Sequence, residues 1–173
     1  RCSPVFRSDK SENRLVSMET LDSVTNSGVP KVRLEFGYDH QGRRMKKTVC
    51  TGYTAGTYST TNVTTFLYDG WNMVMERGTG VSPVTNYYTY GLDLSGSMQG
   101  AGGIGGLLAK TSVSGANTNA VLYMYDANGN VAQVLDSSGT IVAAYEYDPF
   151  GNTIRATGSE SKTNKFCFST KYR

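Results

Sequence analysis

Aspartate is the chemistry-bearing residue that recurs most regularly in this sequence. Six of the eight aspartates begin a four-residue motif that ends in glycine or asparagine. Carboxylates in pairs can act as general acid and base. At the first position of a turn, however, a carboxylate accepts backbone N–H groups, and glycine at the fourth position tolerates positive φ. Because the arrangement is repeated along the chain, we predict turns and assign no catalytic residue. The motifs start at Asp39, Asp69, Asp93, Asp126, Asp136 and Asp148.

The only histidine, His40, lies at the second position of the first of these motifs. A nucleophilic mechanism would need such a residue as its base. Turn positions are exposed, so we predict that His40 is a solvated surface residue.

A glycine-rich stretch, GAGGIG at residues 100–105, matches the dinucleotide-binding fingerprint letter by letter. That fingerprint needs a strand before it, a helix after it and an acidic residue about 20 positions further on. The residues that follow, GLLAKTSVSGA, are rich in small and β-branched types and are too few for that helix. We therefore predict a flexible or tightly packed glycine loop and no bound cofactor.

The cysteines are Cys2, Cys50 and Cys167, an odd number without a C-x-x-C pair. This spacing indicates neither a disulfide framework nor a zinc site, so we predict free thiols and no metal. No apolar run reaches the 18 or so residues of a membrane-spanning helix, and the first 20 residues lack the apolar core of a signal peptide.

The charge balance gives little evidence of a nucleic-acid partner. The formal net charge is +3, from 17 basic and 14 acidic residues. The densest basic run comprises Arg43, Arg44, Lys46 and Lys47. On a strand these side chains divide between two faces, which favours a solvated strand over a phosphate-binding patch.

Pairs of aromatic residues, separated by one position, precede most of the turn motifs. Residues at i and i+2 of a strand point to the same face, so each pair would place two rings together just before its strand ends. Rings on neighbouring strands can then pack as a ladder and form the core. Between second aromatics the separations are 30, 22, 35 and 22 residues, which indicates a repeat with insertions. The pairs are Phe36/Tyr38, Phe66/Tyr68, Tyr88/Tyr90, Tyr123/Tyr125 and Tyr145/Tyr147.

The clearest predicted hairpin spans residues 131–147. Antiparallel pairing in it would place Val134 beside Ile141 and Ala132 beside Ala143 on a dry face, with a mixed face opposite. The Thr- and Gly-rich residues 48–65 are expected to form a long hairpin, and the polar residues 158–165 a loop or linker.

Taken together, these motifs resemble the Rhs/YD-repeat family, specifically the stretch that leads into the Rhs repeat-associated core. The similarity covers most of residues 34–173, and its most specific part is the block 125–158 followed by FCFSTKY at 166–172. In place of the family's usual arginine between these two phenylalanines stands Cys167, and Lys165 replaces a frequent proline. Other matching pieces are GYDHQGRR at 37–44, LYDGWNMVME at 67–76 and YGLDLSGSMQGAGGIGGLLA at 90–109.

The resemblance implies a long spiralling β-sheet that closes into a hollow shell around a C-terminal segment, often a toxin, in a protein that is secreted or displayed at the cell surface. The partner would be the remainder of the same polypeptide. Some members cut themselves with acidic residues that would lie beyond Arg173, so we expect no enzymatic activity in this chain.

We therefore predict an all-β fold of consecutive antiparallel hairpins that form a curved repeat sheet. Residues 1–157 would be the repeat sheet, and residues 158–173 a linker with the start of the core motif. Exposed edges and an uncovered apolar face would make the isolated chain self-associate. The alternative is a glycan-binding or adhesion module that uses aromatics outside the pairs, namely Tyr53, Tyr58, Trp71 and Tyr87.

Overall fold

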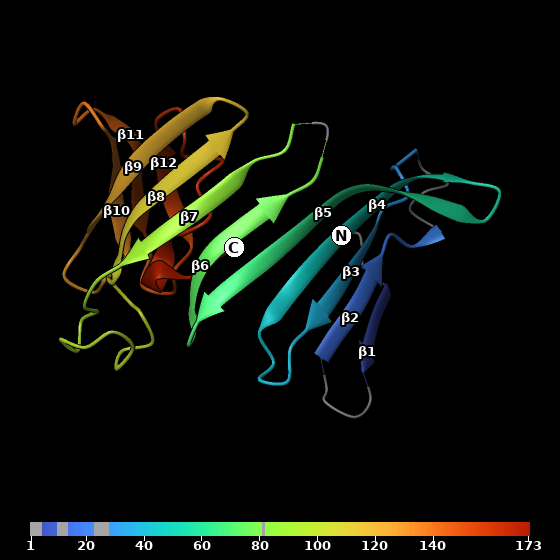
Figure 1. Cartoon of the computed structure of the whole chain (residues 1–173), viewed down its shortest axis with the longest axis horizontal. Coiled ribbons are helices and arrows are strands. Elements are labelled where there is room, and N and C mark those ends of the chain that lie inside the picture. The colour runs from blue at the N-terminus through green and yellow to red at the C-terminus, as the bar shows by residue number, and fades with distance from the viewer. Residues whose placement is uncertain (1–4, 10–13, 23–27, 81) are drawn as a thin grey trace. The chain divides into compact units, whose positions relative to one another are not determined.

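The strands follow one another in the sheet in the order in which they occur in the sequence (Figure 1). The computed structural model describes residues 5–9, 14–22, 28–80 and 82–173. The predicted all-β class of consecutive antiparallel hairpins is confirmed. The strands are β1 (Val5–Asp9), β2 (Arg14–Glu19), β3 (Arg33–Tyr38), β4 (Arg44–Thr54), β5 (Thr57–Asp69), β6 (Asn72–Gly78), β7 (Thr85–Tyr90), β8 (Leu107–Ser114), β9 (Asn117–Tyr125), β10 (Val131–Asp136), β11 (Ile141–Tyr147) and β12 (Thr153–Thr157), and a short 3-10 turn, η1, spans Phe168–Thr170.

The chain divides into two compact units. Unit 1 comprises residues 1–67 and 76–84, and unit 2 comprises residues 68–75 and 85–173. Strand β5 therefore ends in unit 2, and strand β6 begins there.

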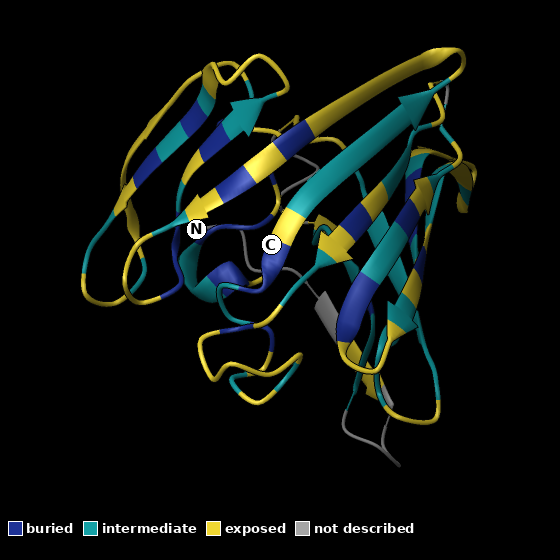
Figure 2. Cartoon of the chain, turned by 60° about the vertical axis from the view of Figure 1, so that its left-hand side comes forward, coloured by how far each residue is buried: buried dark blue, intermediate teal, exposed yellow. Residues whose placement is uncertain are grey.

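Unit 2 is built around one apolar sheet face. In the second half of strand β9 buried and exposed side chains alternate, so that Val121 and Tyr123 are buried whereas Leu122 and Met124 are exposed. Figure 2 shows such alternating bands of buried and exposed residues along the strands. This is the period of two expected of a half-buried strand. The register places Tyr88 opposite Lys110, Lys110 opposite Val121, Tyr123 opposite Val134, and Val134 opposite Ala143. We call this surface, which bears Tyr88, Tyr123 and Tyr145 on strands β7–β11, the ladder face.

Unit 1 has a more polar interior. Its buried residues include Phe66 and Cys50 as well as Ser17, Thr48 and Glu76. Burial of polar side chains requires hydrogen-bonding partners, so this interior is more demanding to assemble than an apolar one.

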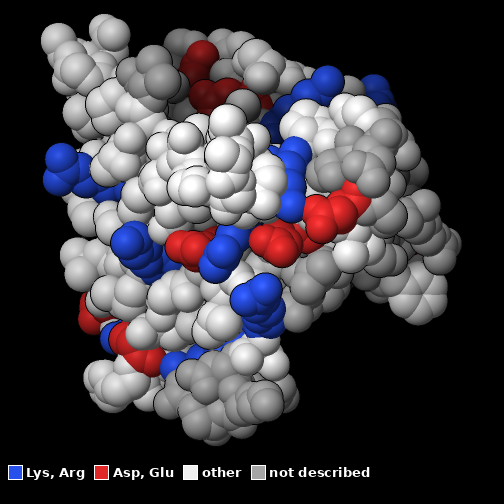
Figure 3. Space-filling view, turned by 90° about the vertical axis from the view of Figure 1, so that its right-hand side faces the viewer, with Lys and Arg blue, Asp and Glu red and all other residues white. Residues whose placement is uncertain are grey.

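The basic run at residues 43–47 does not form a single patch. The guanidinium of Arg44 lies over the rings of Phe36 and Phe66, at 5.8 and 5.2 Å from their centroids. Arg43 pairs with Asp39 at 2.7 Å, and Lys46 is exposed. On the face drawn in Figure 3, basic and acidic side chains lie interspersed.

The predicted long hairpin at residues 48–65 is confirmed by strands β4 and β5. They pair up to Thr54 and Thr57, with Ala55 and Gly56 at the tip. Both tip residues have positive φ, 49° and 85°, which is the pattern of a type I′ turn.

The predicted register of the 131–147 hairpin is wrong. Val134 pairs with Ala143, two residues beyond the predicted Ile141, and Ile141 pairs with Leu135. A β-bulge between Val134 and Leu135 absorbs one residue of strand β11, and this reverses the face of everything beyond it. Ile141 is consequently 50% exposed.

The turn at Asp69 also differs from its prediction. Its positive φ lies at the second position, Gly70, and not at the fourth, Asn72. Asn72 is buried, starts strand β6 and donates its side-chain amide to the Met98 carbonyl at 3.4 Å. The glycine already present at the second position makes the sharp bend, so asparagine is free for a packing role.

Among the described residues no helix is long and apolar enough to cross a membrane. Cys50 and Cys167 are buried free thiols, as predicted, and Cys2 lies outside the described residues.

Candidate functional site

The turn aspartates use their carboxylates to fasten the chain. In the turn at Asp126, one oxygen accepts the N–H groups of Asn128 and Asn130, both at 2.9 Å, and the other accepts the Asn130 side-chain amide at 2.8 Å. Burial by itself would raise the pKa of Asp126, but the hydrogen bonds from Asn130 and Asn128 lower it below its ordinary value. These carboxylates are therefore charged acceptors and poor general bases. The same turn forms at Asp39, Asp93, Asp136 and Asp148.

His40 is exposed in its turn, as predicted. Among the described residues, no group of three or more His, Cys, Asp or Glu side chains is placed to hold a metal ion.

The glycine-rich loop folds around an internal anion. The buried Asp93 carboxylate accepts the N–H and hydroxyl of Ser95 at 2.9 and 2.6 Å, and the N–H groups of Ala101 and Gly103 at 2.7 and 3.1 Å. The hydrogen bond from the Ser95 side chain is the main cause that lowers the pKa of Asp93 to about 2. Burial by itself would raise this pKa. The loop continues directly into strand β8. Of the two predicted alternatives, a flexible or a tightly packed glycine loop, the structure shows the packed one.

The second tyrosine of a pair bonds to the sheet itself. Tyr38 and Tyr147 donate their hydroxyls at 2.8 Å to backbone carbonyls of the preceding strand, and Tyr125 makes the same bond. Each such bond ties the end of one strand to the start of its neighbour. The acceptors are the carbonyl oxygens of Leu15, Val131 and Leu107.

The first tyrosine of a pair bonds instead to residues 158–173, which we call the C-terminal segment. Tyr123 donates to the side-chain oxygen of Asn164 at 2.9 Å, and Tyr145 donates to the Ser161 carbonyl at 3.0 Å. Asn164 in turn donates its amide to the Tyr145 hydroxyl at 3.2 Å. Burial raises the pKa of both tyrosines, so their hydroxyls remain protonated donors.

An aromatic side chain of the C-terminal segment packs on the ladder face. The Phe166 ring meets Tyr88 edge-on with centroids 5.1 Å apart, and it meets Tyr123 at 6.4 Å. Glu160 adds an ion pair with Lys110 at 3.1 Å, also on the ladder face. The C-terminal segment is therefore held by rings, hydroxyls and charge together.

Backbone contacts fix the end of the C-terminal segment. The Thr170 hydroxyl accepts the Gly105 N–H and donates to the Gly129 carbonyl, both at 2.8 Å. It thus joins the glycine-rich loop to the turn at Asp126. The N–H of Val131, the first residue of strand β10, donates to the Cys167 carbonyl at 3.1 Å.

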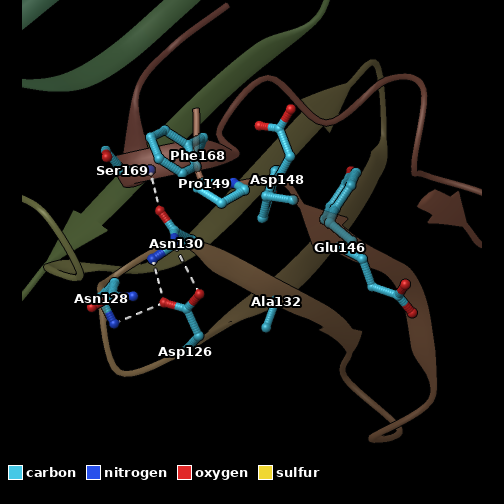
Figure 4. A pocket seen from close by; sticks show the side chains of 11 residues that line it. Asp126, Asn128, Asn130, Ala132, Glu146, Asp148, Pro149, Phe168 and Ser169 are labelled. Carbon is cyan, nitrogen blue, oxygen red and sulfur yellow. Dashed lines mark hydrogen bonds between the residues drawn. The ribbon is translucent and has the colours of Figure 1, made fainter. Parts of the chain in front are cut away.

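A hollow of about 650 Å³ lies beside this junction (Figure 4). At its edge Ser169 donates its N–H to the Asn130 side-chain oxygen at 2.8 Å, and Asn130 is tied to Asp126. The carboxylates of Asp126 and Asp148 both accept N–H groups of their own turns. The chemistry of this hollow is thus structural: its polar groups hold turns against the C-terminal segment.

The aromatics outside the pairs are only partly gathered. In unit 1, Tyr53 and Tyr58 lie 4.8 Å apart, and the Lys31 ammonium lies 4.0 Å from the Tyr53 ring centroid. In unit 2, Trp71 and Tyr87 are exposed and lie on different elements, the β5–β6 turn and strand β7.

The polar residues 158–165 form turns, but their role could not be foreseen from composition. Ser161 and Asn164 are buried among them, at 9% and 5% exposure. The only sequence signal was indirect, because buried tyrosine hydroxyls on the ladder face require partners.

Comparisons with known proteins relate this chain to a known family. Residues 125–163, which include the β10–β11 hairpin and the start of the C-terminal segment, match the family described as RHS Repeat. The chain belongs to the Rhs-repeat family. Over 153 residues it is 32% identical to the tRNA3(Ser)-specific nuclease WapA of Bacillus spizizenii and 31% identical to the tRNA nuclease WapA of Bacillus subtilis strain 168. Each match covers 87% of this chain and 6% of the relative.

Solved structures support the same fold for this Rhs-repeat chain. The crystal structures of TcdB2–TccC3–TEV and of TcdB2–TccC3 without its hypervariable C-terminal region give TM-scores of 0.67 and 0.68. Both are 15% identical in sequence, and the match covers 98% of this chain and 8% of those chains. The chain is thus similar to a small part of much longer proteins, and it is a structural Rhs-type segment.

Proposed function

We propose that this chain is a wall segment of an Rhs-type shell that encloses or delivers a C-terminal polypeptide. One observation carries the proposal: the ladder face already buries a stretch of irregular polypeptide, the C-terminal segment. Tyrosine hydroxyls and apolar side chains bind it without requiring it to become a strand. A wall with such a face can hold irregular polypeptide against itself.

The relatives support this role, and we propose that any enzymatic activity of the full protein lies outside this chain. WapA is named as a nuclease, yet this chain corresponds to 6% of its length. Five of the turn carboxylates, those of Asp39, Asp93, Asp126, Asp136 and Asp148, accept N–H groups of their own turns, which suits a scaffold. We propose that the partner is the rest of the same polypeptide, and that the full protein is secreted or displayed at the cell surface.

Protease protection in the full-length natural protein tests the enclosure. We expect polypeptide downstream of this chain to resist proteinase K under native conditions and to be digested after denaturation. Replacing Val134, which is fully buried on the ladder face, by aspartate should open the wall and remove the protection. The matched control is Gln133→Asp on the exposed face of the same strand. Downstream digestion at the denatured rate in the unmodified protein would refute the proposal.

The glycan-binding alternative stays a prediction. Its test is the fluorescence of Trp71, the only tryptophan, during titration with oligosaccharides. A saturable shift would favour it, and a flat response across a glycan panel would dismiss it.

A further inference from the structure

The first aromatic of the pairs changes type between the two units. In unit 1 the first aromatics are Phe36 and Phe66, and in unit 2 they are Tyr88, Tyr123 and Tyr145. The second aromatic is tyrosine in all five pairs. Only the first position therefore distinguishes one set of repeats from the other.

The surroundings of the first aromatics change in the same way. Phe36 and Phe66 lie beneath the guanidinium of Arg44, a side chain of the sheet itself. Tyr123 and Tyr145 contact the C-terminal segment through their hydroxyls. A buried phenylalanine needs only packing, whereas a buried tyrosine needs an acceptor for its O–H.

The two tyrosines of a unit 2 pair have different hydrogen-bond acceptors. Tyr125 and Tyr147 donate to carbonyls of the adjacent strand, and they also meet the C-terminal segment, Tyr125 at Thr170 and Tyr147 at Cys167 and Phe168. The hydroxyls of Tyr123 and Tyr145 donate to the C-terminal segment, which contributes no strand to the sheet. Its acceptors are a backbone carbonyl and a side-chain carboxamide three residues apart, at Ser161 and Asn164.

We propose that the first aromatic position specifies what each repeat binds on its ring-bearing face. Tyrosine marks a repeat that holds an irregular polypeptide segment through carbonyl or carboxamide oxygens, and phenylalanine marks a repeat whose ring packs against a side chain of the wall. This inference rests on the proposed wall function and names its partner class, an irregular polypeptide segment with spaced amide acceptors. In this chain the occupant is the C-terminal segment.

Hydrogen exchange in the full-length natural protein, followed by mass spectrometry, tests the assignment. Tyr123→Phe and Tyr145→Phe each remove one hydroxyl and keep the ring. We expect each to speed exchange in peptides from residues 158–173 by about tenfold, as for the loss of one net hydrogen bond that leaves a buried acceptor unpaired. Tyr38→Phe in unit 1 is the matched control: it removes a hydroxyl that donates to the Leu15 carbonyl, and it should speed exchange in strands β2 and β3 without an effect on residues 158–173.

Asn164→Ala supplies a second, independent reading of the same contact. The effect of the Tyr123→Phe/Asn164→Ala double variant on exchange should be smaller than the sum of the two single effects, because both substitutions remove the same hydrogen bond. Three outcomes would overturn the assignment. Exchange of residues 158–173 could be unchanged in the Tyr123→Phe/Tyr145→Phe double variant, or it could speed up equally in the control. The effects of Tyr123→Phe and Asn164→Ala could also be fully additive. The readout is the C-terminal segment itself, so it is independent of whether any downstream polypeptide is enclosed.

Discussion

Thr170 is the single residue at which three parts of unit 2 meet: the C-terminal segment, the glycine-rich loop and the turn at Asp126. It is buried, has a positive φ of 53°, and serves both Gly105 and Gly129 with one hydroxyl. A β-branched residue is strained in this backbone region. The structure keeps it because the hydroxyl satisfies two buried backbone groups at once.

Replacing Thr170 by valine should therefore destabilise unit 2 by about 2–4 kcal/mol, because the Gly105 N–H and the Gly129 carbonyl lose their partner while the side-chain shape is kept. Denaturant unfolding measures the loss. Thr170→Ser is the control: it keeps the hydroxyl and relieves the branching, so it should stay within about 1 kcal/mol of the parent. An equal loss in Thr170→Ser would contradict the assignment to the hydroxyl, because serine keeps that group.

Asp93 makes the fold sensitive to acid. Its folded pKa is about 2, below the ordinary value of 3.8, so the folded state binds this proton less readily than the unfolded chain does. Its contribution is complete above pH 4 and is lost as the pH falls toward 2. We expect the thermal midpoint to fall across this window, and less steeply in Asp93→Asn, which cannot ionise. An identical slope in the variant would disprove the linkage.

At the scale of elements, local chemistry made the turns and ring pairs predictable. Asp126, Asp136 and Asp148 use their carboxylates as expected, and glycine supplies the positive φ. The register of the β10–β11 hairpin was not predictable, because a bulge depends on how the turn closes and shifts every later residue by one. The packing of residues 158–173 on the ladder face was also not predictable from the sequence. Its contacts with Tyr123 and Tyr145 join residues 41 and 16 positions apart, and no local pattern encodes such separations.

The tip of the β4–β5 hairpin offers a test of turn chemistry. Ala55 has φ of 49°, a conformation that costs an alanine about 1–2 kcal/mol and that asparagine tolerates better. Ala55→Asn should therefore raise the stability of unit 1 by about 0.5–1 kcal/mol, measured by denaturant unfolding. The control is Ala116→Asn in the β8–β9 tip, where the positive φ, 59°, belongs to the preceding Gly115. Equal effects of the two substitutions would contradict the explanation.

At the scale of the whole molecule, apolar burial is unevenly distributed. Among the described residues, the apolar side chains that are 0% exposed all belong to unit 2: Leu107, Val131, Val134, Ala143 and Cys167. In the described part of unit 1 the buried apolar residues are Cys50 and Phe66, among polar neighbours. Since repeat sheets gain stability from each repeat and its immediate neighbours, local stability should follow this distribution.

Hydrogen exchange on the whole chain should therefore resolve two levels of protection. The slowest amides are expected in strands β9, β10 and β11, where the ladder face is covered by the C-terminal segment, and the amides of β2 and β3 should exchange earlier. The difference follows from burial and not from hydrogen-bond pattern, because both units pair their strands in antiparallel ladders. If strands of unit 1 were the slowest, packing against the C-terminal segment would not be the main source of stability in this repeat sheet. The Tyr123→Phe/Tyr145→Phe variant should reduce the difference in protection between the two units. It loosens the C-terminal segment on the ladder face of unit 2 and leaves unit 1 unchanged.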